Sequence, residues 1–584
     1  MKLFVQKIFN YIIFVFYCGL SLVLTFPLVI NFSKAIPGLS FESFFFLWNQ
    51  WWIRDSLLHF RNPYVTDLIA YPFQSSLVFH TIVFFNDLVS IPLQYIFSAV
   101  VSFNIIFILS LATSAFGMFL LVNYLFKSRL VALLGGIFFV FNFYIYGEML
   151  GHFQYVSVYP IPFFIYYFIK IFNDDKKINS ILAGVFGAIS IYNSYYYAFG
   201  LIFFVAITIG WSLFKNKTLL FLKIKDFILV FFVCLALSLP VLYLSFKTAL
   251  SGNYPFPMLD QINLYTPDLR SFFVPPTLHS VYGDNFINYY NSLSYHSSTV
   301  YLSYLLLVFA VIGYFFGKKD DFFFSSKFWL FFTIIFLFIS LGPLLYLDGY
   351  VFHVSKLLTT IPLPYFLLYK LPFFNGILVP PRFIIFVIFG LIIISAFSLN
   401  ALFTKIKSNW IKFSLALLLV GIFLFENFTL PIPISSVKIP AFYKQLAKEK
   451  EDYVLLELPF ALSTSYYTLG SIQTSAQTQY FQTIHHKKML GGWISRVPDN
   501  YYDFYNKLTG LDYLINPYKR FDEKIMKENG DKTKSNFSKL NVRYIIIHPE
   551  FYDHQTLRNS IDYLSKIYER KPELIDNMLV YKIN

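Results

Sequence analysis

Apolar residues recur along the first 430 positions in runs of about 17 to 25, each long enough as a helix to cross a hydrocarbon core of about 30 Å. Shorter polar segments, several of them rich in Lys, separate these runs. The pattern predicts eleven membrane-spanning helices, at 8–30, 102–125, 130–146, 157–173, 178–194, 196–214, 226–246, 299–316, 328–346, 381–402 and 411–430.

The pattern changes near residue 431. From Pro431 to Asn584 the chain is dense in Lys, Asp, Glu, Asn and Tyr, as in a domain that folds in water. Apolar runs rich in Val, Ile, Leu and Tyr indicate three β-strands, at 453–458, 542–548 and 578–583. Helix-like stretches lie between them, near 440–450, 500–515, 519–529 and 554–569. We therefore expect a membrane domain over 1–430 and an α/β domain over 431–584.

The composition supports this division. Hydrophobic residues make up 57% of the chain, charged residues 13%, and the mean hydropathy is +0.58, so a soluble fold would expose large apolar patches. The net charge of +14 lies largely in short connections between spans, where it indicates orientation rather than nucleic-acid binding. Cys18 and Cys234 both fall in apolar spans, which disfavours a disulfide or a cysteine metal site.

The segment 82–98 decides the topology. It is apolar but contains Asn86, Asp87, Pro92 and Gln94, which favours an interfacial or re-entrant piece over a lipid-facing span. If it does not cross, the basic clusters all lie on the side of the N-terminus: Lys127 with Arg129, Lys176 with Lys177, Lys215 to Lys225, Lys318 with Lys319, and Lys405 with Lys407.

The expected fold class is therefore a polytopic α-helical membrane protein with about eleven transmembrane helices and a C-terminal extracytoplasmic α/β domain. The N-terminus lies in the cytoplasm and the protein resides in the cytoplasmic membrane. The connections outside are three long ones and a short one, at 31–101, 247–298, 347–380 and 147–156. Because every cytoplasmic connection is short, we expect the active site to face outward.

The first outside segment carries aromatic and charged residues in a helical pattern. Trp48, Trp51 and Trp52, followed by basic residues, predict a helix at the membrane surface with its rings in the headgroup zone, most simply as an anchor. Glu42 stands at the start of this helix, where the helix N-terminus favours the ionised carboxylate. Asp67 and His80 follow in the same segment and serve substrate binding, loop capping or contacts at the membrane interface.

Two further places hold polar groups near the outer membrane surface. Glu148, His152 and Gln154 surround the short outside connection, and ionisable groups at membrane depth are costly and usually functional, although a hydrogen-bonded neutral histidine is the alternative. Arg382 follows two prolines at the outer entry of a span, where its guanidinium suits a phosphate or an ordinary lipid headgroup.

The tail segment 483–498 contains His485, His486, Lys487 and Lys488 near two glycines. Two adjacent histidines without a third spaced ligand are a weak metal signal. The segment is either a structural loop or a patch that binds an acceptor or a lipid headgroup. Phosphate-binding and nucleophile motifs of the usual kinds are absent, which argues against a nucleotide-driven pump.

Several stretches taken together resemble the GT-C glycosyltransferase superfamily, particularly its YfhO-like members. They are LWNQWW, NPYVTDLIAYPFQSSLVFHT, VNYLFKSRLVALLGGIFFVFNFY, LGHFQYVSVYPIPFFI, LPFFNGILVPPRF and TIHHKKMLGGWISRVP, in this order over most of the chain. The resemblance implies a membrane enzyme that transfers a sugar from a polyprenyl-phosphate or polyprenyl-diphosphate donor to an acceptor on the outer face. The acceptor would be a glycan, a lipid or a protein, and no nucleic acid is involved.

The resemblance also implies roles for individual residues. Glu42 matches the acid that deprotonates or orients the acceptor, although many members carry Asp there. An acid near the short outside connection helps to position a metal or the acceptor, which points to Glu148 with His152 and Gln154, and a divalent cation is possible. Arg382 would meet the departing phosphate. A single base without a covalent intermediate predicts inversion at the anomeric carbon.

Two other classes of protein fit part of the pattern. A lipid or polysaccharide transporter would also have many spans, but the inverted repeats common in transporters are not evident here. A non-catalytic scaffold of the cell envelope would fit the aromatic content of the tail. Unequal loop lengths favour the enzyme over the transporter.

Overall fold

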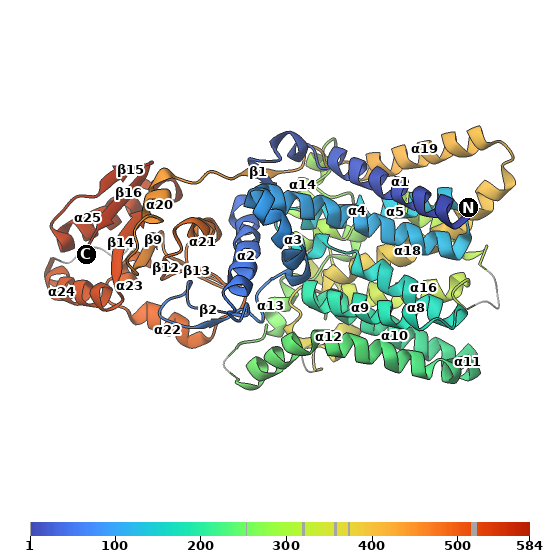
Figure 1. Ribbon diagram of the computed structural model, residues 1–584, viewed down its shortest axis with the longest axis horizontal. Coiled ribbons are helices and arrows are strands. Elements are labelled where there is room, and N and C mark those ends of the chain that lie inside the picture. The colour runs from blue at the N-terminus through green and yellow to red at the C-terminus, as the bar shows by residue number, and fades with distance from the viewer. Residues whose placement is uncertain are drawn as a thin grey trace. The chain divides into compact units, whose positions relative to one another are not determined.

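The computed structural model describes residues 2–215, 217–252, 254–317, 322–354, 359–371, 374–465, 467–515 and 523–583. The chain forms two compact units, drawn in Figure 1. Unit 1 contains residues 1–32, 104–240 and 256–433. Unit 2 contains residues 33–103, 241–255 and 434–584, so the first outside segment folds with the tail.

Unit 1 is helical. Its long helices are α1 (Lys2–Val23), α4 (Ala99–Phe126), α5 (Arg129–Val140), α8 (Pro160–Asn173), α9 (Lys177–Asn193), α10 (Tyr195–Lys215), α12 (Ile224–Leu250), α15 (Tyr304–Tyr314), α16 (Ser326–Ser340), α18 (Ile384–Lys405) and α19 (Asn409–Glu426). Each of the eleven predicted spans thus contains a helix. Among the described residues, eight stretches are long and apolar enough to cross a membrane, while α15 and α16 are shorter apolar helices.

Helix α18 forms the centre of unit 1. It is apolar on all sides and buried over almost its whole length, and it packs against α5, α15 and α16. By contrast, α1, α12 and α19 expose apolar side chains such as Ile12, Phe231 and Leu418, as helices that face lipid do. A polytopic membrane protein accounts for both patterns.

Short elements connect these helices. They are η1 (Leu28–Asn31), α6 (Phe143–Glu148), α7 (Phe153–Val156), α11 (Lys217–Leu222), α13 (Leu259–Asn263), η2 (Leu269–Phe272), η3 (Gly283–Phe286), α14 (Ile287–Tyr290), η4 (Tyr295–Thr299), β4 (Tyr346–Leu347), β5 (Tyr350–Val351), β6 (His353–Val354), β7 (Thr359–Thr360), α17 (Pro364–Leu368), η5 (Phe374–Gly376) and η6 (Pro380–Phe383). Of these, α6, α7 and η6 carry the candidate site.

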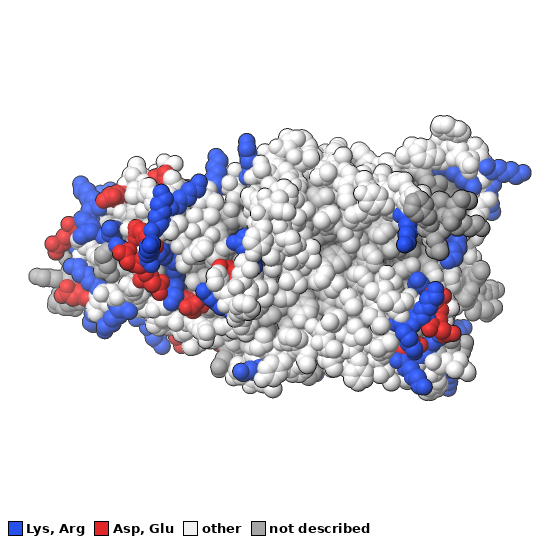
Figure 2. Space-filling model, in the orientation of Figure 1, with Lys and Arg blue, Asp and Glu red and all other residues white. Residues whose placement is uncertain are grey.

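Charged residues are unevenly distributed over unit 1. On the face drawn in Figure 2 they gather at the end that holds α11 and the start of α19, and a wide uncharged surface adjoins them. This end includes the predicted cytoplasmic connections at 215–225 and 405–407. Lys318 and Lys319, also assigned to that side from the sequence, lie outside the described residues.

The tail in unit 2 is an α/β domain. Its five-stranded sheet has the order β12-β9-β14-β16-β15; β12, β9 and β14 pair in parallel, and β16 pairs antiparallel with both β14 and β15. The strands are β9 (Val454–Leu458), β12 (Lys488–Met489), β14 (Val542–Ile547), β15 (Glu573–Ile575) and β16 (Met578–Lys582). A smaller sheet joins β10 (Ala461–Ser463) to β11 (Thr468–Gly470) and β13 (Gly492–Trp493). The three predicted strands correspond to β9, β14 and β16.

The helices of the tail are α20 (Ala441–Leu446), α21 (Ile472–His485), α22 (Asp499–Lys507), α23 (Leu511–Ile515), α24 (Glu523–Lys539), η7 (Pro549–Phe551) and α25 (His554–Tyr568). The four predicted helical stretches correspond to α20, α22 with α23, α24 and α25, although 519–522 lies outside the described residues. Helix α21 was not predicted. Its polar face of Thr, Ser and Gln side chains is buried, which hides the usual helical periodicity.

The first outside segment completes unit 2. It consists of β1 (Ala35–Pro37), α2 (Ser40–Leu58), β2 (Val65–Thr66), β3 (Ser75–Ser76) and α3 (Phe84–Ile96). Strand β1 pairs with β8 (Ile434–Ser436), and α2 packs along α21. The 13 residues of α3 rise about 20 Å, less than a hydrocarbon core requires.

The sequence pattern predicted that the tryptophans of α2 anchor this helix at the membrane surface, and that prediction is wrong. Trp48, Trp51 and Trp52 are buried, with 0%, 5% and 1% of their surface exposed. The Trp48 indole N–H donates to Gln482 Oε1 of α21 at 2.8 Å, and the Trp52 indole N–H donates to the Pro63 carbonyl at 2.9 Å. The aromatic-belt rule fails here because α21 covers the face of α2 that the sequence assigned to lipid.

Candidate functional site

A buried carboxylate marks the end of α6. The Asn142 side chain caps this short helix by accepting a hydrogen bond from the backbone N–H of Ile145 at 3.2 Å. The helix therefore starts at a fixed point, and its last residue is Glu148, whose side chain is fully buried. A buried carboxylate requires charged or hydrogen-bonding partners, and two side chains provide them.

The first partner is Arg382 in η6, directly before α18. Its Nε lies 3.4 Å from Glu148 Oε1, and its Nη1 donates to Tyr155 Oη at 3.1 Å. The preceding Pro380 and Pro381 fix the backbone and lack N–H groups, so the turn holds the guanidinium at the entry of the central helix. Only 9% of the arginine side chain is exposed.

The second partner is His152. Its Nδ1 lies 3.1 Å from Glu148 Oε2, and its backbone N–H donates to the Glu148 carbonyl at 2.8 Å. At 20% exposure, His152 is the most accessible member of the group. Glu148 thus stands between a guanidinium and an imidazole, with one carboxylate oxygen directed to each.

Aromatic rings surround the guanidinium. Its central carbon lies 3.8 Å from the centroid of the Tyr155 ring and 5.4 Å from that of Tyr196, within the range of cation–π attraction. Tyr196 Oη also accepts hydrogen bonds from the backbone N–H groups of Leu378 and Val379, at 3.0 and 2.9 Å. Tyr196 therefore holds the backbone that precedes Arg382 and also packs against one side of the guanidinium.

Two further tyrosines complete this frame. Tyr197 Oη donates to the Tyr155 carbonyl at 2.6 Å and lies 3.0 Å from Tyr144 Oη. Sequence reasoning missed all four tyrosines. The run Tyr195–Tyr197 at the outer end of a predicted span was the available signal, since tyrosine in a span needs a partner for its hydroxyl.

The structure thus brings together three of the predicted site residues, Glu148, His152 and Arg382. Gln154 is buried in α7, two residues beyond His152, and its role stays a prediction. Glu42 belongs to unit 2, where its backbone lies in the first turn of α2, but its side chain lies outside the described part of the chain.

Glu148, His152 and Arg382 do not make a metal site on their own. Among the described residues, no group of three or more His, Cys, Asp or Glu side chains is placed to hold one. The Arg382 guanidinium beside Glu148 already neutralises the carboxylate, which lowers its attraction for a cation. An arginine framed by aromatic rings at the start of α18 is instead suited to an anion.

The other predicted residues lie in unit 2 and have structural partners. Asp67, half exposed, pairs with Lys488 of the tail at 3.2 Å. His80 Nδ1 accepts from the Ser495 backbone N–H at 3.2 Å, and its Nε2 lies 3.0 Å from Asn49 Oδ1. Burial lowers the pKa of His80 to about 3, so it is neutral and ties the first outside segment to the tail.

The histidine-lysine segment of the tail is likewise structural. His485 Nδ1 accepts from the Lys487 backbone N–H at 3.0 Å, and burial lowers the pKa of this histidine to about 3. Lys487 Nζ donates to the carbonyls of Glu449 and Glu451, at 2.6 and 2.7 Å. Of the two interpretations, these contacts favour the structural loop.

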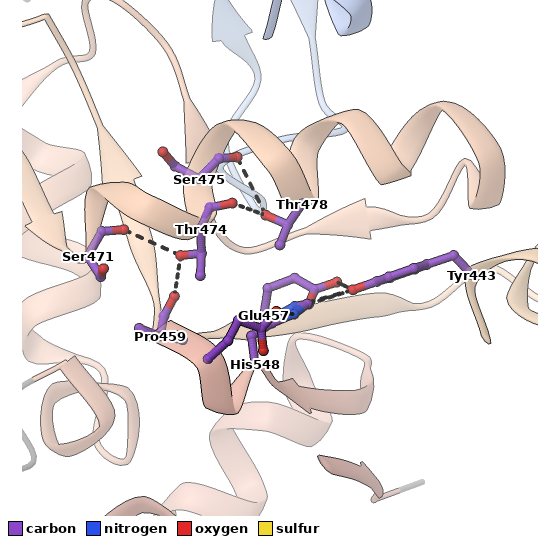
Figure 3. Close-up of polar contacts among 9 residues, drawn as sticks. Tyr443, Glu457, Pro459, Ser471, Thr474, Ser475, Thr478 and His548 are labelled. Carbon is purple, nitrogen blue, oxygen red and sulfur yellow. Dashed lines mark hydrogen bonds and ion pairs between the residues drawn. The ribbon is translucent and has the colours of Figure 1, made fainter. Parts of the chain in front are cut away.

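One buried ionic cluster was not foreseen. Glu457 near the end of β9 meets His548 directly after β14, with 2.8 Å between Oε2 and Nε2, and Tyr443 Oη donates to the same carboxylate (Figure 3). Hydrogen bonds to Glu457 and Glu550 outweigh burial and raise the pKa of His548 to about 9. The cluster holds the ends of two parallel strands to α20.

Comparison with known proteins places the fold. No family model and no curated protein matches the chain. Among solved structures, the mycobacterial arabinofuranosyltransferase AftD matches with a TM-score of 0.53 at 12% identity, over 94% of this chain and 38% of that chain.

Two other structures match less well. The oligosaccharyltransferase AglB from Archaeoglobus fulgidus has a TM-score of 0.48 at 11% identity, over 93% of this chain and 70% of that chain. ArnT from Cupriavidus metallidurans has a TM-score of 0.45 at 10% identity, over 97% of both chains. The likeness to AftD confirms the predicted fold class: a polytopic helical membrane protein of GT-C-like architecture with a C-terminal sheet domain.

Proposed function

We propose that this protein is a membrane glycosyltransferase that uses a polyprenyl-phosphate sugar donor. One observation carries the proposal: a buried arginine, framed by aromatic rings, beside an acid and a histidine at the entry of the central helix. The fold shared with an arabinofuranosyltransferase and the sequence resemblance to GT-C enzymes agree with this assignment. The same sequence resemblance points to the YfhO-like members of the superfamily.

The arginine suits a lipid phosphate. A guanidinium has five N–H donors, of which two are engaged, by Glu148 and Tyr155, in the part of the chain that the structure describes. The others are free to bind phosphate oxygens, and a charge-assisted pair of this kind is strongest where water is excluded. Arg382 would therefore hold the donor and stabilise its phosphate as it departs.

The reaction needs few groups. The acceptor oxygen forms a bond to the anomeric carbon, the bond from that carbon to the phosphate oxygen breaks, and the electron pair stays on the phosphate. A base takes the acceptor proton, and the resemblance assigns that role to Glu42. Direct displacement inverts the anomeric carbon. Arg382 offsets the second negative charge that develops on the leaving lipid phosphate.

The test is transfer by the full-length protein in liposomes, with a panel of polyprenyl-phosphate sugars. Arg382→Gln should reduce transfer by roughly 10²- to 10³-fold, as removal of one charge-stabilising donor does in other enzymes. Arg270→Gln is the matched control, because Arg270 lies in the same unit but is 59% exposed and pairs with Asp348. Wild-type turnover in Arg382→Gln, with unchanged melting, would contradict the assignment.

The proposal places the site outside the cytoplasm. It rests on the basic connections of unit 1, which the positive-inside rule assigns to the cytoplasmic side together with the N-terminus. A reporter that is active only in the cytoplasm, fused after Asn584, should be silent, and the same reporter inserted in the 405–407 connection should be active. Activity at the C-terminus would reverse the topology.

A further inference from the structure

The candidate site is electrically neutral before any ligand enters. Arg382 contributes one positive charge and Glu148 one negative charge, and their side chains are 9% and 0% exposed. A polyprenyl-phosphate sugar is a phosphodiester and brings one further negative charge. An uncompensated charge in so buried a place is costly, so binding requires a compensating positive charge or proton.

The contact between the two charged residues is loose. Their closest atoms, Arg382 Nε and Glu148 Oε1, are 3.4 Å apart, whereas charge-assisted N–H···O bonds are usually about 2.7–2.9 Å long. The other carboxylate oxygen already lies 3.1 Å from His152 Nδ1. Glu148 can therefore give up its contact with the arginine and keep a partner.

His152 is the member of the group that can exchange a proton with water, since its side chain is 20% exposed. Among the described residues, the titratable and charged groups with a known contact to it are Glu148, Tyr155 and, beyond the carboxylate, Arg382 from η6. Of these, Glu148 is the nearest, with its Oε2 3.1 Å from His152 Nδ1. A protonated His152 would hold Glu148 as an ion pair.

We propose that a lipid phosphodiester binds Arg382 together with one proton, which His152 takes up. Glu148 then exchanges its arginine contact for a full ion pair with the imidazolium. Arginine and imidazolium carry two positive charges, carboxylate and phosphodiester two negative charges, so the site is neutral before and after binding. This inference rests on the proposed function and names His152 as a positioning residue for its substrate.

The proposal has a quantitative consequence. If a proton binds with the ligand, affinity falls by up to tenfold per pH unit wherever His152 is neutral in the free protein and protonated in the complex. The affinity is therefore to be compared over pH 6–9, where the charge of a phosphodiester does not change. A site that relied on Arg382 alone would bind a phosphodiester equally well across this range.

The experiment uses methyl farnesyl phosphate, a phosphodiester whose charge stays at one over pH 6–9. Binding to the full-length protein is measured by calorimetry at each pH, in two buffers with different ionisation enthalpies. The wild type should take up close to one proton at pH 8. In His152→Gln the uptake should fall to near zero and the affinity should no longer depend on pH. The matched control His554→Gln, at an exposed histidine of unit 2, should behave as wild type.

The outcomes separate the two proposals. Binding that survives Arg382→Gln unchanged would remove the phosphate from this site, and the proposed function would lose its main support. If Arg382→Gln loses binding and the wild type binds without taking up a proton, the role of His152 is overturned and the role of Arg382 stands. The wild-type proton count requires no variant, so poor folding of His152→Gln would not leave the inference untested.

Discussion

Replacing Glu148 with glutamine should weaken the free protein and strengthen its hold on phosphate. The variant removes the only charge that faces Arg382 at 3.4 Å among the described residues. At an effective dielectric constant of about 20, two unit charges at this distance attract by about 5 kcal/mol. Breaking other buried ion pairs lowers the free energy of unfolding by about 3–5 kcal/mol. We expect at most this loss here, because the glutamine amide can still accept a hydrogen bond from the guanidinium.

The same change leaves the arginine charge uncompensated, so an anion becomes the best available partner. Methyl farnesyl phosphate should therefore bind Glu148→Gln more tightly than it binds the wild type, and without proton uptake. At a hundred times its Kd the ligand adds about 2.7 kcal/mol of stability, enough to restore much of the deficit.

The assay is thermal melting of the full-length protein in detergent, with and without the phosphodiester. Glu573→Gln, at an exposed position of β15, is the matched control. A ligand-free Glu148→Gln that melts with the wild type would show that the pair contributes little. Weaker phosphate binding by this variant would refute the idea that Glu148 and the phosphate compete for Arg382.

Three other predictions concern unit 2. Glu42→Gln should lower transfer by roughly 10²- to 10⁴-fold if Glu42 is the base, with little change in melting, and near wild-type turnover would remove it from the mechanism. The pKa of His548 is raised to about 9, so its pair with Glu457 stabilises the fold fully below pH 6.5, and this contribution is lost as pH rises through 9. The melting temperature should therefore fall in alkaline buffers. In His548→Gln it should depend less on pH. Gln482→Leu should lower the free energy of unfolding by about 2–4 kcal/mol, because two hydrogen bonds with the first outside segment and one with the nearby Lys487 carbonyl are lost. The exposed control Gln555→Leu should change it very little, and equal melting of the two variants would refute the role of Gln482.

The helices of unit 1 were predictable because lipid imposes a simple rule, a long apolar run for each crossing. The ends of these helices were less predictable. The span expected at 299–316 begins only at Tyr304, since Glu426 binds the side chains of Tyr301 and Ser303 and accepts the backbone N–H of Leu305. Glu426 lies about 120 positions further along the chain, so the sequence around Tyr304 does not indicate that the helix starts there.

The site was predictable in part for a similar reason. Glu148 and His152 are four residues apart and Arg382 follows two prolines, and ionisable groups are rare in membrane segments, so each residue stood out. The tyrosine frame did not, because tyrosine is common throughout this chain. Trp48 was misassigned because its partner, the polar helix α21, lies more than 400 positions away and has no apolar stripe.

The composition of unit 2 has a consequence for biosynthesis. Its first part ends at Phe103 and its last part begins at Ile434, 331 positions later. Helix α2 ends at Leu58, whereas β8 begins at Ile434 and α21 at Ile472, so at synthesis rates of about 5–20 residues per second α2 waits about 20–80 s for the elements that cover it. During that interval Trp48 and Trp51 lack their contacts with Gln482 and His486, while most of the membrane helices are still being inserted. The buried face of α2 therefore stays uncovered until α21 has been synthesised.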